Sequence, residues 1–424
     1  MPPIQSVPSL AEEFDALVTC RPDLIADPYP FYRRLREEAP VYRHADQVVV
    51  TSLDDVTRVL LDSSTFLNGH AGLKGSRVRA NLDAAPPKRR RKMIEILEFR
   101  GGGLNHLNGE QHERLRALAH KAFTPRRIRA MEERIQKIAD ELLDRVAPAG
   151  EMEVISDFAF QLPLIVICEM LDVPPDDRYP IRKWVNDIAA FQDGSNPAVV
   201  DDTHTSMFAL RDHLRGIFER RRGGPTTDLM GALLAAEGEG GDRFAEEELL
   251  PVVAHFVFAG HETTTNLIGN ALRALLTEYR DQWELLRADP ALVPDGVEEL
   301  LRYDTSVQLT NRTAAEHCEI AGTPVRQWET VTLVLGAGNR DPKHFDNPDR
   351  VDITRAESRH LGFGLGPHFC LGAALTRLET TIAFRTLVRR FPELEVAVPT
   401  VTYRADHRLR GVESLPVLLG PQRA

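Results

Sequence analysis

The sequence predicts a mainly α-helical protein with small β-sheets, and three observations support that fold class. Helical patterning runs through residues 112–278 with few interruptions. Its last part, residues 246–279, is apolar on several sides and would span about 50 Å as one helix, so it should cross the middle of the protein. Strand-like patterning is confined to short stretches near 319–336 and 396–420. No linker divides the chain, and we expect one domain over residues 1–424.

The N-terminal part of the chain predicts short elements. Residues 1–27 contain several prolines and indicate an extended arm. A helix is expected over Tyr29–Glu38 and a strand over residues 47–51, which are rich in valine. Ser52 should then cap a helix over Leu53–Leu61.

A long segment with little periodicity follows at residues 68–109. It is rich in Gly, Pro and Asn, and such a stretch favours a functional loop or lid. Its basic run, residues 88–92, could attract an acidic substrate or an acidic carrier protein, or it could be a solvated surface.

The C-terminal part alternates helices with irregular structure. Helices are expected over residues 295–303 and 371–391. Between them, residues 339–369 are dense in Pro, Gly, Asp and Arg but keep apolar anchors, which predicts an ordered meander.

Composition excludes several classes of function. The chain has 424 residues, a net charge of −11 and a pI near 5.7, which argues against general nucleic-acid binding. Its four cysteines are far apart and form no CxxC pair, so neither a zinc ribbon nor a disulfide framework is expected. No apolar run approaches the length of a membrane span and the N-terminus has no signal-peptide pattern, so we expect a soluble cytoplasmic protein.

The strongest chemical signal is FGLGPHFCLG at residues 363–372. Its glycines permit backbone conformations closed to other residues. Cys370 precedes a predicted helix, where free N–H groups and the helix dipole favour a thiolate, and such a thiolate can be the axial ligand of a haem iron. For Cys370 alone, a buried cysteine in a Gly-rich turn is the alternative, but it does not explain the whole pattern.

A second signal, AGHETT at residues 259–264, lies inside the predicted long helix. Gly260 costs about 1 kcal/mol in helix propensity and leaves room for a close approach to the backbone. The adjacent acid and alcohol, Glu262 and Thr263, suggest a proton relay, with an ordinary polar break in a helix as the alternative. A zinc-protease HExxH site is excluded, because position 265 is a threonine.

Two weaker signals follow. Glu299 and Arg302 are three residues apart, so they share a helix face, but such pairs are common. The meander contains NRDPKHFDNPD at residues 339–349 and then Arg355, a possible partner for Glu299.

Together, in this order and at these separations, the four elements resemble the cytochrome P450 family, and most closely its soluble bacterial members. The resemblance extends over nearly the whole chain. It implies the cytochrome P450 fold, a triangular domain with a long central helix over the haem, and haem b (iron protoporphyrin IX) as the cofactor.

The resemblance also implies a role for each motif. Cys370 would be the axial thiolate and the iron ligand, and Glu262 and Thr263 would deliver protons to dioxygen. A structural triad would form from Glu299, Arg302 and Arg355. Haem propionates are anionic and need cationic or hydrogen-bonding partners, and the positions that match the family's contacts are His112, Arg116, Arg312 and His368.

The implied activity is that of a haem-thiolate monooxygenase, which hydroxylates or O-demethylates a small organic substrate as a monomer. Electrons would come from a ferredoxin and its NAD(P)H-dependent reductase. Residues 112–129 carry several basic side chains and one acid, Glu113, which would suit an acidic ferredoxin. A hydrogen-peroxide-driven peroxygenase and a non-catalytic haem-binding protein are the alternatives, and the intact acid–alcohol pair argues against both.

Helical spacing adds an inference about the substrate. His255, Ala259 and Thr263 are four residues apart and share a face. If Thr263 faces the iron, then His255 and Ala259 would face the substrate, and His255 could hydrogen-bond a polar or acidic group. A histidine satisfied by a backbone carbonyl is the alternative. Phe99 and Phe191 could line the same pocket.

Overall fold

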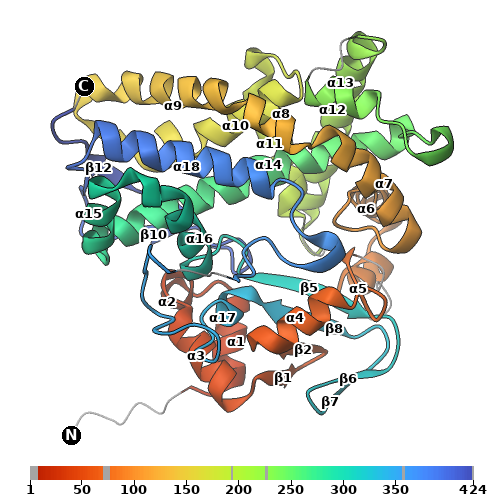
Figure 1. Ribbon diagram of the computed structural model, residues 1–424. Helices are drawn as coiled ribbons and strands as arrows, with labels where there is room; N and C mark the ends of the chain where they lie inside the picture. Colours follow the sequence, from red (N-terminus) through yellow and green to blue (C-terminus); the bar gives the residue numbers. More distant parts are fainter. Residues whose placement is uncertain (1–7, 70–76, 192–193, 225–227, 356–358, 423–424) are drawn as a thin grey trace, which may run out of the picture.

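A β-rich region with short helices and a larger helical region lie one above the other in Figure 1. The computed structural model describes residues 8–69, 77–191, 194–224, 228–355 and 359–422. None of the helices in this part of the chain is long and apolar enough to cross a membrane.

The N-terminal helices pack beside the largest sheet (Figure 1): α1 (Leu10–Val18), α2 (Pro22–Ala26), α3 (Tyr29–Glu38) and α4 (Leu53–Leu61). The predictions for α3 and α4 are confirmed, and the Ser52 hydroxyl accepts a hydrogen bond from the Asp55 amide at 3.2 Å. The prediction of an extended arm is wrong from residue 10 onward. Ser9 and Glu12 form a capping box that begins α1, while residues 1–7 lie outside the described part.

The largest sheet has five strands in the order β1–β2–β8–β5–β3. Their bounds are β1 (Val41–His44), β2 (Gln47–Val50), β3 (Phe66–Leu67), β5 (Leu309–Ala314) and β8 (Thr330–Val334). The central pair β2 and β8 is parallel, with Val48 opposite Val331, and the other pairs are antiparallel. Buried valines fill β2 and β8, which explains their central place.

The described residues form three smaller sheets as well, and these confirm the expectation of short strands near the C-terminus. They contain β4 (Glu151–Glu153), β12 (Pro416–Leu418) and β9 (Glu395–Val396) in one sheet, β10 (Thr402–Tyr403) and β11 (Val412–Ser414) in another, and the hairpin β6 (Cys318–Ile320) and β7 (Thr323–Val325).

The segment expected to be a loop is largely helical. It forms α5 (Arg77–Ala84) and α6 (Pro87–Gly101), so the prediction for residues 68–109 is wrong there. The basic run at 88–92 is the start of α6. Behind it, three apolar side chains are buried at helical spacing in a cluster with residues of α12 (Pro197–Arg221): Met93, Ile96 and Leu97. Residues 70–76 lie outside the described part.

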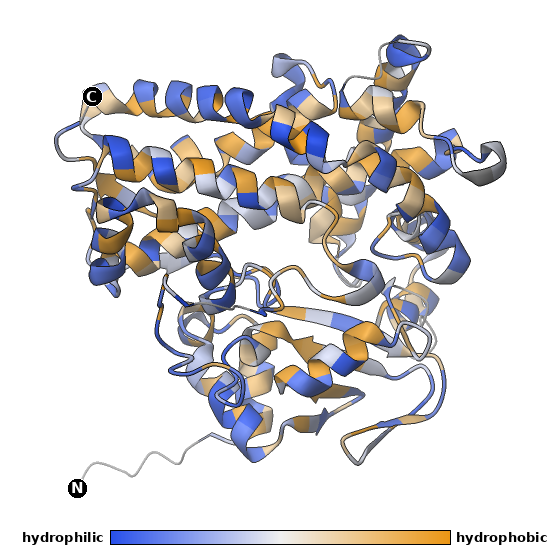
Figure 2. Cartoon of the chain, in the orientation of Figure 1, coloured by the Kyte–Doolittle hydropathy of each residue, from blue (hydrophilic) through white to orange (hydrophobic). Residues whose placement is uncertain are grey.

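The remaining helices are those of the upper layers in Figure 1 and the short α17, which packs against α3 and α4 in the lower region. They are α7 (Gly109–Ala122), α8 (Pro125–Ala130), α9 (Glu132–Val146), α10 (Gln161–Met170), α11 (Arg178–Ala190), α13 (Leu229–Leu234), α14 (Glu246–Thr277), α15 (Arg280–Ala288), α16 (Val293–Tyr303), α17 (Leu335–Gly338) and α18 (Ala373–Arg390). Hydrophilic and hydrophobic residues alternate along α9 in Figure 2, as expected for a helix that covers a core.

The helix α14 confirms the prediction of a long central helix. It packs against α10, α18, α15 and α11, and nearly all of its side chains from Thr264 to Leu276 are buried. At Gly260 an added Cβ would come within 3.1 Å of the Ile167 side chain on α10. The expected close approach to this glycine is therefore made, at least on one side, by a neighbouring helix.

Candidate active site

A cavity of about 300 Å³, the inner cavity, lies between α14 and the cysteine loop at residues 363–372. Ala259, Gly260 and Thr263 line it from α14, and Phe363 and Cys370 line it from the loop. Most of the remaining wall is apolar, with Leu104, Phe256, Leu267, Leu335 and Leu375 among its side chains. The strongest two sequence motifs therefore meet at one apolar space.

Backbone hydrogen bonds hold the cysteine loop in shape. The Cys370 amide donates to the Phe363 carbonyl at 2.9 Å, which closes the loop on itself. Gly366 has φ +71° and sits so close to α4 that an added Cβ would lie 2.7 Å from the Leu60 carbonyl oxygen. The glycines thus serve both turn geometry and close packing on the β-rich region.

Opposing influences act on the Cys370 thiol. Burial raises its pKa, while the amides of Gly372 and Ala373 and the Arg116 guanidinium act to lower it. Burial dominates, so the start of α18 does not by itself stabilise the expected thiolate. A coordinating metal ion would deprotonate a thiol in this position.

Two arginines at the inner cavity have no acidic partner among the described residues. Arg312 is 6% exposed and donates to Asn68 Oδ1 at 3.0 Å and to the Asn311 carbonyl at 2.9 Å. Arg116 donates to the Phe369 carbonyl. Burial lowers the pKa of Arg312 to about 10, so it keeps its charge near neutral pH. Two cations without counter-ions at an apolar cavity fit a flat apolar group that carries carboxylates.

Two histidines lie next to these arginines. The rings of His112 and His368 are 4.0 Å apart, and His368 lines the inner cavity. Burial lowers the pKa of His112 to about 4 and that of His368 to about 3, so both are neutral donors near pH 7. The Nε2 atom of His112 is buried and has no hydrogen-bond partner in the described structure, which leaves it free for an anionic ligand.

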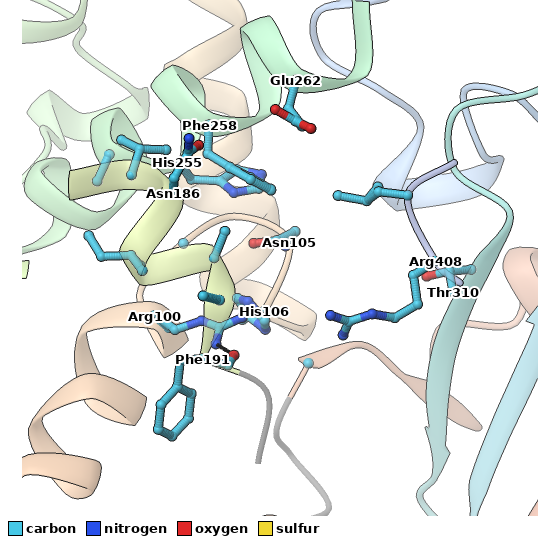
Figure 3. A pocket seen from close by; sticks show the side chains of 18 of the residues that line it. Arg100, Asn105, His106, Asn186, Phe191, His255, Phe258, Glu262, Thr310 and Arg408 are labelled. Atoms are coloured by element: carbon cyan, nitrogen blue, oxygen red, sulfur yellow. Dashed lines mark hydrogen bonds between the residues drawn. The ribbon is translucent and has the colours of Figure 1, made fainter. Parts of the chain in front are cut away.

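The expected proton-relay pair is divided between two cavities. Thr263 lines the inner cavity, and its hydroxyl donates to the Ala259 carbonyl at 3.0 Å. Glu262 lines a second space and accepts a hydrogen bond from Arg404. Figure 3 shows the Glu262 carboxylate pointing from α14 into that second space.

This second space, the outer cavity, has a volume of about 600 Å³. Phe99 and Phe191 line this outer cavity and not the inner one, which Ala259 and Thr263 line. Four residues line both cavities, so the two spaces adjoin: Asn68, Asn105, His255 and Thr310. His255 thus faces the space next to Thr263, and Ala259 faces the inner cavity itself. Burial lowers the pKa of His255 to about 4, and the Arg100 charge acts in the same direction.

Glu299, Arg302 and Arg355 are in contact. Arg302 is fully buried and donates to both carboxylate oxygens of Glu299 at 2.7 and 2.8 Å, while Arg355 donates to one of them at 3.0 Å. Arg302 also donates to the carbonyls of Asn339 and Arg350 in the meander. The three side chains join α16 to the segment that leads into the cysteine loop.

The chain is similar to known proteins over nearly its whole length. The cytochrome P450 107B1 of Saccharopolyspora erythraea is 39% identical over 414 residues, which cover 94% of this chain and 98% of the relative. The chain belongs to the cytochrome P450 family. A family model described as Cytochrome P450 matches residues 285–403, which include the meander and the cysteine loop. Relatives named as hydroxylases and monooxygenases establish it as a P450 monooxygenase that uses haem b with an axial cysteine.

Other P450 relatives span several substrate classes. The vitamin D(3) 25-hydroxylase of Pseudonocardia autotrophica is 38% identical over 405 residues, which cover 94% of this chain and 95% of the relative. The solved structure of PksS, a bacillaene polyketide synthase P450 from Bacillus subtilis 168, has a TM-score of 0.84 at 32% identity and covers 95% of this chain and 99% of that one. P450BioI, solved with an acyl-loaded carrier protein, has a TM-score of 0.83 at 34% identity over 93% of this chain and 99% of that one.

Sequence reasoning missed the charged wall of the outer cavity. This wall includes Arg100, Arg404 and Arg408. Arg100 directly follows the predicted Phe99, but residues 404–408 belong to no motif, because their place depends on how the loop between β10 and β11 packs.

Proposed function

We propose that this P450 inserts one atom of O₂ into a small organic substrate held in the inner and outer cavities, by hydroxylation or O-demethylation. Electrons come from a ferredoxin and its NAD(P)H-dependent reductase. One observation supports this most directly: Cys370 and Thr263 line the same apolar cavity from two different elements.

Cys370 ligates the iron in this proposal, and the bound haem supplies the O₂-activating and electron-accepting chemistry. Arg116 and Arg312 offset the charge of the propionates, and neutral His112 and His368 donate hydrogen bonds to them. The apolar wall around them excludes water from the reacting space.

Thr263 and Glu262 move protons in this proposal. Among the described residues the Thr263 hydroxyl has one hydrogen bond, to the Ala259 carbonyl, so rotation about its side chain lets it donate into the inner cavity. Glu262 faces the outer cavity and must leave Arg404 before it can exchange a proton with Thr263. The two residues together carry protons from the outer cavity to the inner one.

The ferredoxin is proposed to dock on a smaller basic surface than the sequence suggested. Arg114 is paired with Asp242 and Glu248, and Arg116 faces the inner cavity. The docking surface is therefore the exposed remainder of this segment: Lys121, Arg126 and Arg129. Helix α8 packs against α18, which follows the cysteine loop, so this surface lies on the cysteine side of the molecule.

Replacing Thr263 with valine tests the proposal. In the haem-loaded enzyme with ferredoxin and reductase, we expect Thr263→Val to lower the yield of oxygenated product per NAD(P)H consumed by about 100-fold, the lower end of the range for loss of a proton-transfer group. Thr265→Val is the matched control, because Thr265 makes the same bond to a carbonyl four residues earlier but lines neither cavity. Equal yields from both variants would contradict the role of Thr263, and full-rate turnover with hydrogen peroxide alone would identify a peroxygenase instead.

A further inference from the structure

The outer cavity has an excess of positive charge. Among the described residues, three arginines and two acids line it: Arg100, Arg404, Arg408, Glu262 and Asp406. Glu262 is bonded to Arg404, which neutralises that pair. Asp406 Oδ1 accepts hydrogen bonds from the amides of Arg408 and Leu409 at 2.8 and 3.1 Å, so it is occupied by its own loop.

Arg100 and Arg408 are thereby left without a full counter-ion. Arg100 donates to the Phe191 carbonyl and pairs with no carboxylate in the described part of the chain. Arg408 comes no closer to Asp406 than 4.0 Å, and its buried Nε atom has no hydrogen-bond partner. Figure 3 shows Arg408 reaching into the cavity from one wall, with Arg100 on the opposite wall.

The electrostatics of this wall favour an anion. Burial lowers the pKa of Arg100 to about 10, and the charge of Arg408 adds to this effect. A carboxylate placed between the two guanidinium groups would relieve their repulsion and accept charge-assisted hydrogen bonds. Neutral His255, which lines the same cavity, could donate one more.

We propose that Arg100 and Arg408 bind a carboxylate of the substrate, so that this P450 oxidises organic acids. This inference rests on the proposed monooxygenase function and names its substrate class. Gly102 and Gly103, next to Arg100, pack against Pro251 and His255 at the N-terminal half of α14. His255 precedes Thr263 by two turns, about 12 Å along the helix. The carboxylate binds in the outer cavity while oxidation takes place in the inner one, so the substrate must be an acid long enough to reach across both adjoining cavities.

Matched acids and esters test this inference. The probes are dodecanoic, hexadecanoic and abietic acids and their methyl esters, titrated into the haem-loaded protein and followed by the Soret shift and by the rise in Tm. We expect at least one acid to bind about 10- to 100-fold more tightly than its ester, the range for a hydrogen bond to a charged group.

Variants then locate the preference. Arg408→Gln and Arg100→Gln should each remove most of the preference for the acid over its ester, and Arg408→Lys should keep part of this preference. Arg389→Gln, which removes the same charge from an exposed site on α18 that lines neither cavity, should leave it unchanged. The inference is overturned if acids bind no better than esters, if Arg408→Gln keeps the full preference, or if only an acyl carrier protein loaded with dodecanoate binds. Failure of the proposed function is separate, since it would appear as tight binding of an acid without NAD(P)H-dependent oxygenation.

Discussion

Glu299 is a buried carboxylate whose charge is shared by two arginines, and it is 1% exposed. We expect Glu299→Gln to lower the free energy of unfolding by about 3 kcal/mol, because the change leaves buried guanidinium groups without a counter-ion. Urea unfolding followed by tryptophan fluorescence measures this change. Glu284→Gln breaks exposed pairs with Arg280 and Arg287 and should cost about 1 kcal/mol or less. If both variants lose similarly small amounts of unfolding free energy, the triad of Glu299, Arg302 and Arg355 does not stabilise the fold.

Glu379 on α18 is also 1% exposed, but neither of its carboxylate oxygens has a hydrogen-bond partner in the described structure. Burial raises its pKa well above the ordinary value. The folded protein therefore keeps a proton that the unfolded chain loses above about pH 4.3. This group favours folding fully only below that pH, and its contribution is lost as the pH rises toward the folded pKa.

This difference in proton binding predicts a pH-dependent effect of Glu379→Gln. As the pH rises from the unfolded to the folded pKa of Glu379, the original protein should lose about 1.4 kcal/mol of unfolding free energy per pH unit relative to the variant, which has no group that titrates at this position. Urea unfolding of both proteins at about pH 5.5 and 6.5 provides the comparison. A difference that is the same at both pH values would mean that Glu379 is ionised in the folded state.

At the scale of elements, the cysteine loop depends on two glycines that differ in their surroundings. Both have positive φ, +65° at Gly364 and +71° at Gly366. An added Cβ at Gly364 would have its nearest neighbour at 3.9 Å, whereas at Gly366 it would meet the Leu60 carbonyl at 2.7 Å. A side chain at position 364 costs only the strain of the backbone conformation. A side chain at position 366 must in addition displace α4 or the cysteine loop.

We therefore expect Gly364→Ala to lower the free energy of unfolding by about 1 kcal/mol. Gly366→Ala should lower it by more than about 2 kcal/mol, because the backbone clash adds to the conformational cost. Gly366→Ala should also reduce the fraction of protein purified with bound haem, which absorbance at the Soret band measures. Equal effects of the two substitutions would show that packing against α4 does not determine the loop.

The elements also show what could be predicted from sequence. The helices α14, α16 and α18 followed from periodicity and breakers alone. Helix α6 did not, because five consecutive cationic residues obscure its buried face, and Pro87, which stands at its first position, lies in a segment rich in Gly, Pro and Asn. Helix α1 was also not predicted, because the segment around it contains several prolines, although Ser9 and Glu12 form its capping box.

The same limit applies to the site. Cys370, Thr263, Arg116, Arg312 and His368 lie in the sequence patterns that resemble the P450 family, so their meeting at one cavity could be expected. Arg408 lies in a loop that an isolated bridge between Val307 and Leu409 joins to a distant segment. A local sequence pattern carries no information about such a long-range contact, so the charged wall of the outer cavity could be identified only from the structure.

At the scale of the whole molecule, a net charge of −11 coexists with exposed cations on the cysteine side. The acidic ferredoxin of the proposed function would be repelled by the net negative charge and attracted to the proposed docking surface at Lys121, Arg126 and Arg129. We expect the double change Arg126→Glu and Arg129→Glu to slow reduction by an acidic ferredoxin by about tenfold or more at low salt.

Stopped-flow reduction at low and high ionic strength measures the effect, which should fade at about 1 M salt, where screening is strong. Arg222→Glu together with Arg389→Glu is the control, because it changes the net charge equally at exposed positions elsewhere. If the control pair slows reduction as much, the net charge matters and the proposed docking surface does not.

The two cavities share α14 as a common wall, and this has a consequence for where a substrate is attacked. The carboxylate is anchored by Arg100 on α6 and by Arg408 in the loop between β10 and β11, and the reacting end lies in the inner cavity beside Thr263. Both ends of the substrate are then held by fixed parts of the fold, so the distance between the anchored carboxylate and the reacting carbon is the same for every acid that binds. Straight-chain acids of different length would therefore gain their oxygen at a constant carbon number from the carboxyl end, while the position counted from the methyl end would shift.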